Sequence, residues 1–179
     1  DDGWGPFKGG YSDRDSMTKY IYSGGTSMAT PLTAGAAALV REFYLKGKPS
    51  WAPSSALVKA TLINGAAEMS PGQYGTGTTQ EMSRRPNPVE GWGRVDVARA
   101  LSPAAPRAVH WIDRPGPLQT GKYHRLQYQV KYPAEALRVT LVWTDAPGTP
   151  YSYNALVNDL DLKVTDPAGE SRFVPVKLN

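Results

Sequence analysis

The pattern of apolar and polar positions predicts a long helix in the first third of the chain. Residues 28–40 form a run of small and aliphatic residues with no charge until Arg41. Such a run is too apolar for a surface helix, so we expect a helix buried on all sides. Proline is tolerated in a first helical turn, so Pro31 indicates the helix start. The helix turns amphipathic over residues 41–46 and is expected to end at Gly47.

A second helix is predicted over residues 56–63, where apolar residues recur at helical spacing before the breaker Asn64-Gly65. Residues 70–88 are polar and rich in glycine and proline, which indicates an exposed loop. The proline-rich stretch 102–106 is a break in composition, and we place a domain boundary there. The predicted domains are residues 1–102 and residues 103–179.

Beyond this boundary the pattern changes from helical to alternating. Apolar and polar residues alternate over residues 123–132, 137–143 and 160–164, and a turn signal follows at residues 166–169. Strands with no helices between them predict an antiparallel β-sandwich or jelly roll.

Composition excludes several classes of function for the 179 residues. The net charge is +4 and the basic residues are scattered, so we expect no nucleic-acid partner. No apolar run approaches the roughly 20 residues that span a bilayer, so we expect no membrane partner. Cysteine is absent, which excludes disulfides and thiolate metal sites.

The main candidate for a catalytic residue is Ser27, which lies just after two glycines at the entrance to the first predicted helix. A hydroxyl in this position lies at the positive end of the helix dipole, beside free backbone N–H groups that suit a developing oxyanion. The structural alternative is that Ser27 or Thr26 merely caps the helix.

The complete motif around Ser27 favours a catalytic role for this serine over a role as a helix cap. Gly-Thr-Ser-Met-Ala-Thr-Pro at residues 25–31, followed by Ala-Gly-Ala-Ala-Ala-Leu, resembles the active-site serine motif of the subtilisin-like serine proteases. The resemblance implies an α/β catalytic domain in which Ser27 is the acyl-forming nucleophile of a Ser-His-Asp triad. It also implies a strand over residues 19–22 and a substrate cleft bordered by a short segment. That segment comprises Ser23, Gly24, Gly25 and Thr26.

The family's chain order implies that this chain is a C-terminal portion of the catalytic domain. The order is Asp, then His, then Ser, so the triad partners and the oxyanion asparagine are expected upstream of Asp1. Polypeptide substrates and the missing N-terminal part of the catalytic domain are therefore the expected partners. An extracellular location is inferred from the family.

A second resemblance concerns the C-terminal half. Residues 91–95, 141–147 and 156–162 together resemble the alkaline subtilases that carry a C-terminal β-barrel. Gly91-Trp92-Gly93 resembles the Gly-x-Gly turn that closes the catalytic domain in subtilisin-like proteases and leads into a short helix, and its Trp resembles that branch. The β-domain there continues beyond the position of Asn179, so we expect this one to be truncated.

One oxygen-rich group of residues suggests a metal. Its members are Asp145, Asn158, Asp159 and Asp161. Calcium prefers several such hard oxygens, and the family often uses calcium for stability. The alternative is that these side chains cap turns and accept hydrogen bonds from loop amides.

Two other functions remain open. The only histidines, His110 and His124, follow Ser27, an order that suits an α/β-hydrolase. However, the nucleophile elbow of that fold needs glycine where this chain has Ala29. The second alternative is a catalytically silent interaction or stability module, or a pseudoprotease fragment, because losing triad members lowers the rate by orders of magnitude.

Overall fold

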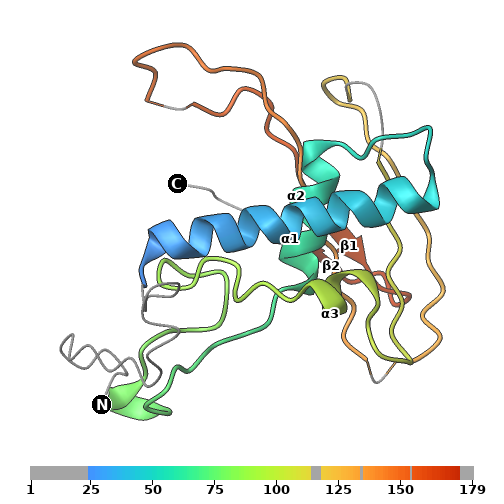
Figure 1. The fold of residues 1–179 in the computed structure, drawn as a ribbon. Helices are drawn as coiled ribbons and strands as arrows, with labels where there is room; N and C mark the ends of the chain where they lie inside the picture. The colour runs from blue at the N-terminus through green and yellow to red at the C-terminus, as the bar shows by residue number, and fades with distance from the viewer. Residues whose placement is uncertain (1–23, 114–117, 134, 154, 174–179) are drawn as a thin grey trace. The chain divides into compact units, whose positions relative to one another are not determined.

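The computed structural model describes residues 24–113, 118–133, 135–153 and 155–173. The chain divides into two compact units, residues 1–35 and residues 36–179. The elements in these described residues are, in order, α1 (Thr26–Gly47), α2 (Ser55–Gly65), η1 (Gly77–Thr79), α3 (Val97–Leu101), β1 (Lys163–Thr165) and β2 (Ser171–Phe173) (Figure 1). The strand expected over residues 19–22 lies outside the described residues.

The start of α1 differs from the expectation. The helix begins at Thr26, so Pro31 lies inside it and does not indicate its first turn. Gly25 precedes the helix with a φ of 120°, a conformation that glycine adopts without the steric penalty of a side chain. Because Pro31 has no N–H, the carbonyl of Ser27 four residues earlier has no intrahelical donor. The glycine turn, and not the proline, therefore fixes where α1 begins.

The burial of α1 is confined to one side. Ala36, Val40 and Tyr44 are its buried residues, and they recur every four positions on one face. Leu39 and Phe43 keep 53% and 47% of their surface exposed. The expectation of a helix buried on all sides is therefore wrong for the described structure. An apolar run permits burial on every side, but burial also needs neighbouring elements on every side.

The core of the second unit forms where α1 packs on α2. Val40 is fully buried and lies with Tyr44 and Leu57 in one cluster. The hydroxyl of Thr61 donates to the carbonyl of Leu57 at 2.8 Å. The Tyr44 hydroxyl lies 2.9 Å from the same Thr61 oxygen and is therefore its donor. Burial raises the pKa of Tyr44 above its usual value, and the bond to Thr61 offsets part of that rise.

Aromatic rings extend this core across the predicted domain boundary. Trp111 stacks on Trp51, with the ring centres 5.2 Å apart and the planes 15° apart. Tyr44 meets Trp111 edge-on at 5.0 Å. The ammonium group of Lys48 lies 5.4 Å from the Trp111 ring, within the range of a cation–π interaction. Residues on both sides of the stretch 102–106 therefore share one apolar cluster.

Both shorter helices follow the sequence predictions. α2 confirms the helix expected over residues 56–63, and α3 confirms the short helix expected after the Gly91–Gly93 turn. Asp96 caps α3 by accepting the Arg99 N–H at 2.9 Å. α2 and α3 pack closely where Gly65 faces Ala100, since a Cβ at Gly65 would lie 2.7 Å from the Ala100 nitrogen.

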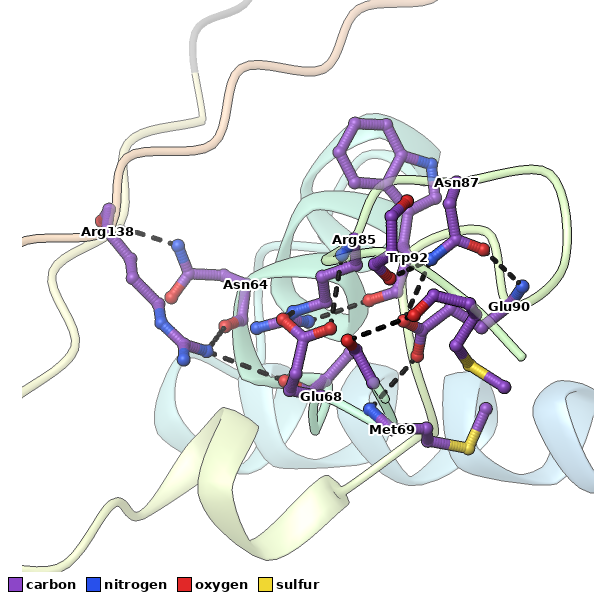
Figure 2. Close-up of polar contacts among 12 residues, drawn as sticks. Asn64, Glu68, Met69, Arg85, Asn87, Glu90, Trp92 and Arg138 are labelled. Atoms are coloured by element: carbon purple, nitrogen blue, oxygen red, sulfur yellow. Dashed lines mark hydrogen bonds and ion pairs between the residues drawn. The ribbon is translucent and has the colours of Figure 1, made fainter. Parts of the chain in front are cut away.

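The polar loop between α2 and α3 is held by side-chain hydrogen bonds (Figure 2). Arg85 donates to the carbonyl of Trp92 at 2.7 Å and pairs with Glu68 at 3.6 Å. The amide oxygen of Asn87 accepts the N–H groups of Val89 and Glu90, each at 2.9 Å. The loop is largely exposed, as expected, yet it has a defined conformation because its turns are closed by its own side chains.

The C-terminal residues contain a two-stranded antiparallel sheet. β1 pairs with β2, with Val164 opposite Arg172. The connection closes through the Gly169 N–H donating to the Asp166 carbonyl at 3.0 Å, and Gly169 has a φ of 87°. This confirms the turn predicted at residues 166–169.

The larger sandwich is not confirmed. In the described part of the chain, residues 123–132 and 137–143 belong to no strand, and β1–β2 is the sheet that forms. Alternation indicates that a segment suits a half-buried sheet, but a strand also needs a partner to complete its hydrogen-bond ladder. The domain boundary near residue 102 stays a prediction.

Candidate active-site serine

Ser27 lies in the first turn of α1, immediately after Thr26, and its side chain is exposed. The turn is closed by the carbonyl of Gly25, which accepts the N–H of Met28 at 3.0 Å and of Ala29 at 3.2 Å. The N–H groups of Thr26 and Ser27 precede the first possible intrahelical acceptor, so the helix itself leaves both donors available. The hydroxyl therefore lies at the helix N-terminus beside N–H groups that have no acceptor within the helix.

The electrostatics of this helix end favour negative charge. The N-terminus of a helix carries roughly half a positive elementary charge. The first turn of α1 contains no acidic residue that would neutralise it. An oxyanion formed beside Ser27 would therefore be stabilised by the dipole and by the N–H groups that precede the first helical hydrogen bond. The sequence already contains this signal, because no charged residue precedes Arg41 in the run that begins at Ser27.

The segment predicted to border the substrate cleft is described in part. Gly24, Gly25 and Thr26 are exposed and lead directly into Ser27. Ser23 lies outside the described residues. The role of these four residues in substrate binding stays a prediction.

The two histidines lie in the second unit. The ring of His110 meets Tyr128 edge-on, with the ring centres 5.3 Å apart. His124 is exposed. The contact of His110 is an ordinary aromatic packing arrangement. It gives no support to a hydrolase in which one of these histidines acts as the base.

The carboxylate of Asp145 is already occupied by amide donors. It accepts the N–H groups of Val157 at 2.8 Å, Asn158 at 3.0 Å and Ala146 at 2.9 Å. The side-chain amide of Asn158 adds a fourth hydrogen bond at 2.7 Å. The Val157 bond is the main reason that the pKa of Asp145 lies below its usual value, and the Asn158 and Ala146 donors lower it further. Asp145 therefore fastens the two ends of the loop 146–157 together.

In this arrangement the Asp145 carboxylate faces hydrogen-bond donors. An amide that donates a hydrogen bond presents positive character to the carboxylate, so the lone pairs of Asp145 are directed at N–H groups. The structure brings Asn158 to Asp145 through its nitrogen, whereas a cation would need its oxygen. Among the described residues, no three acidic or histidine side chains gather around a point that could hold a metal. Calcium binding by Asp145, Asn158, Asp159 and Asp161 stays a prediction.

Comparison with known proteins agrees with the character of the Ser27 site. Residues 9–93 match the model of the subtilase family, and this range contains Ser27 and the whole of α1 and α2. A Dictyostelium discoideum protein named "Serine protease/ABC transporter B family protein tagA" is 30% identical over 77% of this chain. A second from that organism, "Serine protease/ABC transporter B family protein tagD", is 27% identical over 84% of it. These matches support a serine peptidase of the subtilase type.

The likeness covers a small share of each relative. The chain spans 8% of the length of the first protein and 10% of the second. No solved structure matches the chain significantly. None of the described helices has the length and sustained hydropathy that a bilayer crossing requires. The family match covers residues 9–93 and the two relatives align with most of this chain, but the activity of the whole protein stays a proposal.

Proposed function

We propose that this chain is the nucleophile-bearing C-terminal portion of the catalytic domain of a subtilisin-like serine endopeptidase. The observation that carries the proposal is the exposed Ser27 in the first turn of α1, behind the Gly25 turn and with no acid nearby in the helix. The match of residues 9–93 to the subtilase family supports it. The β-sandwich proposed for residues 103–179 belongs to the same reading, as the additional domain of the alkaline branch.

In the proposed reaction, the Ser27 oxygen attacks the carbonyl carbon of the scissile peptide bond. The hydroxyl proton passes to a histidine, and the carbonyl oxygen becomes an oxyanion that accepts the Ser27 N–H. The intermediate collapses when the C–N bond breaks, and the histidine returns the proton to the departing amine. Water then attacks the acyl-enzyme by the same route, which releases the acid and restores Ser27.

The histidine, its orienting aspartate and the oxyanion asparagine are proposed to come from sequence preceding residue 1. The family's order of Asp, His and Ser supports this source. The substrates are polypeptides; the segment from Ser23 to Thr26 would border the cleft that binds them, with Ser23 and Gly24 on its leaving-group side. We further propose that the whole enzyme acts outside the cell, as family members often do.

Labelling with a fluorophosphonate probe, located by mass spectrometry, tests this function. The samples are the 179-residue chain and the longest natural polypeptide that contains it. We expect the longer polypeptide to be labelled at Ser27 and the label to be lost in Ser27→Ala. Ser55→Ala is the matched control, because Ser55 is also exposed and opens a helix but lacks the motif.

The outcomes separate the proposal from its alternatives. Labelling of the 179-residue chain by itself would mean that a base is present within it, and His110 and His124 would need renewed attention. No labelling of the folded longer polypeptide would refute the peptidase and support a silent module in which Ser27 is only a helix residue. Equal loss of label in Ser55→Ala would show that the probe reports folding and not the nucleophile.

A further inference from the structure

The N-terminus of α2 is capped by Ser54, which directly precedes the helix, and by Asp113, which lies 59 residues further along the chain. Ser54 is the cap residue, and its hydroxyl oxygen accepts the Leu57 N–H at 3.0 Å. The carboxylate of Asp113 accepts the Ser54 N–H at 2.8 Å and the Ser54 hydroxyl proton at 2.7 Å. The hydroxyl can serve both neighbours because it donates one proton while its lone pair accepts another. A carboxylate from beyond residue 102 is thus part of the cap of this helix.

The C-terminus of α2 is held in a similar way by residues further along the chain (Figure 2). The guanidinium group of Arg138 donates to the carbonyls of Asn64 and Ala66 at 3.4 and 3.5 Å. In return, the Asn64 side-chain amide donates to the Thr140 hydroxyl at 2.9 Å and to the Arg138 carbonyl at 3.4 Å. The last carbonyls of a helix lack intrahelical donors, so Arg138 supplies hydrogen bonds that α2 cannot supply itself.

The two charges have the signs that the helix dipole favours. α2 has no acidic residue in its first turn and no basic residue in its last turn. Asp113 places a negative charge at the positive end, and Arg138 places a positive charge at the negative end. Burial lowers the pKa of Arg138, and the nearby charges of Arg99 and Arg85 lower it further. Arginine nevertheless remains protonated in proteins, so this charge is permanent.

Aromatic packing anchors the segment that carries Asp113 in the core. Trp111, two residues before Asp113, stacks on Trp51 and meets Tyr44 edge-on. The segment that caps α2 is therefore anchored in the same cluster that joins α1 to α2. A hydroxyl contact at 3.4 Å between Ser55 and Thr144 adds a further connection near the N-terminus of α2.

We propose that the part of the chain beyond residue 102 acts as a clamp on both ends of α2. The clamp consists of Trp111, Asp113, Arg138 and Thr140. Its function is to keep α2 from fraying and so to hold the Tyr44–Thr61 and Val40–Leu57 contacts by which α2 supports the helix that carries Ser27. The C-terminal part is thereby a stability element of α2 and of the half of α1 that packs on it. This inference does not depend on the peptidase activity.

Hydrogen exchange measured by mass spectrometry on the full 179-residue chain tests the clamp. Asp113→Asn removes the negative charge while keeping the shape, and we expect exchange in peptides covering residues 54–58 to rise about tenfold, as for loss of a charged hydrogen bond. Arg138→Gln is expected to raise exchange over residues 63–67 by about threefold, because its bonds are longer. Ser54→Ala should raise exchange around residues 107–113, because the Ser54 hydroxyl also holds Asp113 in place.

Matched controls separate the clamp from general charge effects. Glu42→Gln and Lys122→Gln remove exposed charges that do not contact α2 in the described structure, and exchange in α2 should stay within a factor of two of the parent. Thr140→Val is a milder variant that removes only the contact with Asn64 and is expected to loosen residues 63–67 selectively. Equal exchange of α2 in all variants and controls would overturn the clamp, as would loosening that is uniform over the whole chain.

Discussion

The close contact between α2 and α3 at Gly65 gives a sharp test of the helix packing. A Cβ added at Gly65 would lie 2.7 Å from the Ala100 nitrogen and closer still to its Cα and Cβ. Ordinary contacts between such atoms are about 3.5 Å or longer, so α2 and α3 would have to separate by roughly 0.8 Å or more. The neighbouring atoms belong largely to backbone, which cannot rotate out of the way as a long side chain can. Gly65→Ala is therefore expected to destabilise the fold by about 1–3 kcal/mol.

The matched substitution is Gly47→Ala. Gly47 is the last residue of α1, as Gly65 is the last residue of α2, and no atom would lie within 4 Å of its added Cβ. With open space and no left-handed backbone, Gly47→Ala should stabilise by about 0.4–1 kcal/mol through the lower entropy of the unfolded chain. The same chemical change is thus expected to have opposite signs at the two helix ends.

Thermal unfolding followed by circular dichroism measures both variants. For a chain of this size, 1 kcal/mol shifts the midpoint by about 2–4 °C. We therefore expect Gly65→Ala to melt about 2–10 °C below the parent and Gly47→Ala to melt about 1–4 °C above it. A Gly65→Ala variant as stable as Gly47→Ala would refute the close approach of α2 to α3.

Two further predictions concern titratable side chains. Tyr44→Phe removes the bond to Thr61 and should cost about 0.5–1.5 kcal/mol in urea unfolding, whereas Tyr74→Phe, at an exposed tyrosine, should have little effect. Because the pKa of Tyr44 is raised from 10.0, its contribution is complete below that pH and is lost as the pH rises through the raised pKa; Tyr44→Phe should lack this loss. Asp145→Ala should open the loop that its carboxylate closes and speed chymotrypsin cleavage at the loop's exposed tyrosines, while Asp159→Ala should not. Because the pKa of Asp145 is lowered from 3.8, this protection against cleavage is present above that pH and is lost as the pH falls through the lowered pKa. A protective effect of calcium that EGTA abolishes would instead favour a metal site.

The local elements that the sequence predicted well are those whose signals are contained within a few residues. The helix of α2 was predicted from apolar spacing and the Asn64-Gly65 breaker, and the turn at residues 166–169 from its own turn residues. The serine at the start of α1 was predicted from its motif and the preceding glycines, and the structure places Ser27 in the first turn. These features depend on backbone preferences that neighbouring residues impose directly.

Features that depend on distant partners were not predictable in the same way. The sequence shows that residues 28–40 can be buried, but the faces of α1 that are covered depend on where α2 and Trp111 pack. Likewise, alternation over residues 123–132 does not supply the neighbouring strand that a ladder requires. Burial and strand pairing are pairwise properties of the folded chain, so a pattern within one segment leaves them open.

The sequence by itself determined the nucleophile candidate and its helix, because a glycine turn, a serine and a small-residue run act over a few consecutive positions. Only the tertiary structure decided how α2 is held and what Asp145 does. Asp113 lies 59 residues from Ser54, and Arg138 lies 74 residues from Asn64, so no local pattern could reveal that they cap one helix. The sequence leaves Asp145 open as a metal ligand or as an acceptor for loop amides, and in the fold its oxygens accept four N–H groups because residues 157 and 158 return to it. Charges and carboxylates acquire their roles from the donors that the fold places around them.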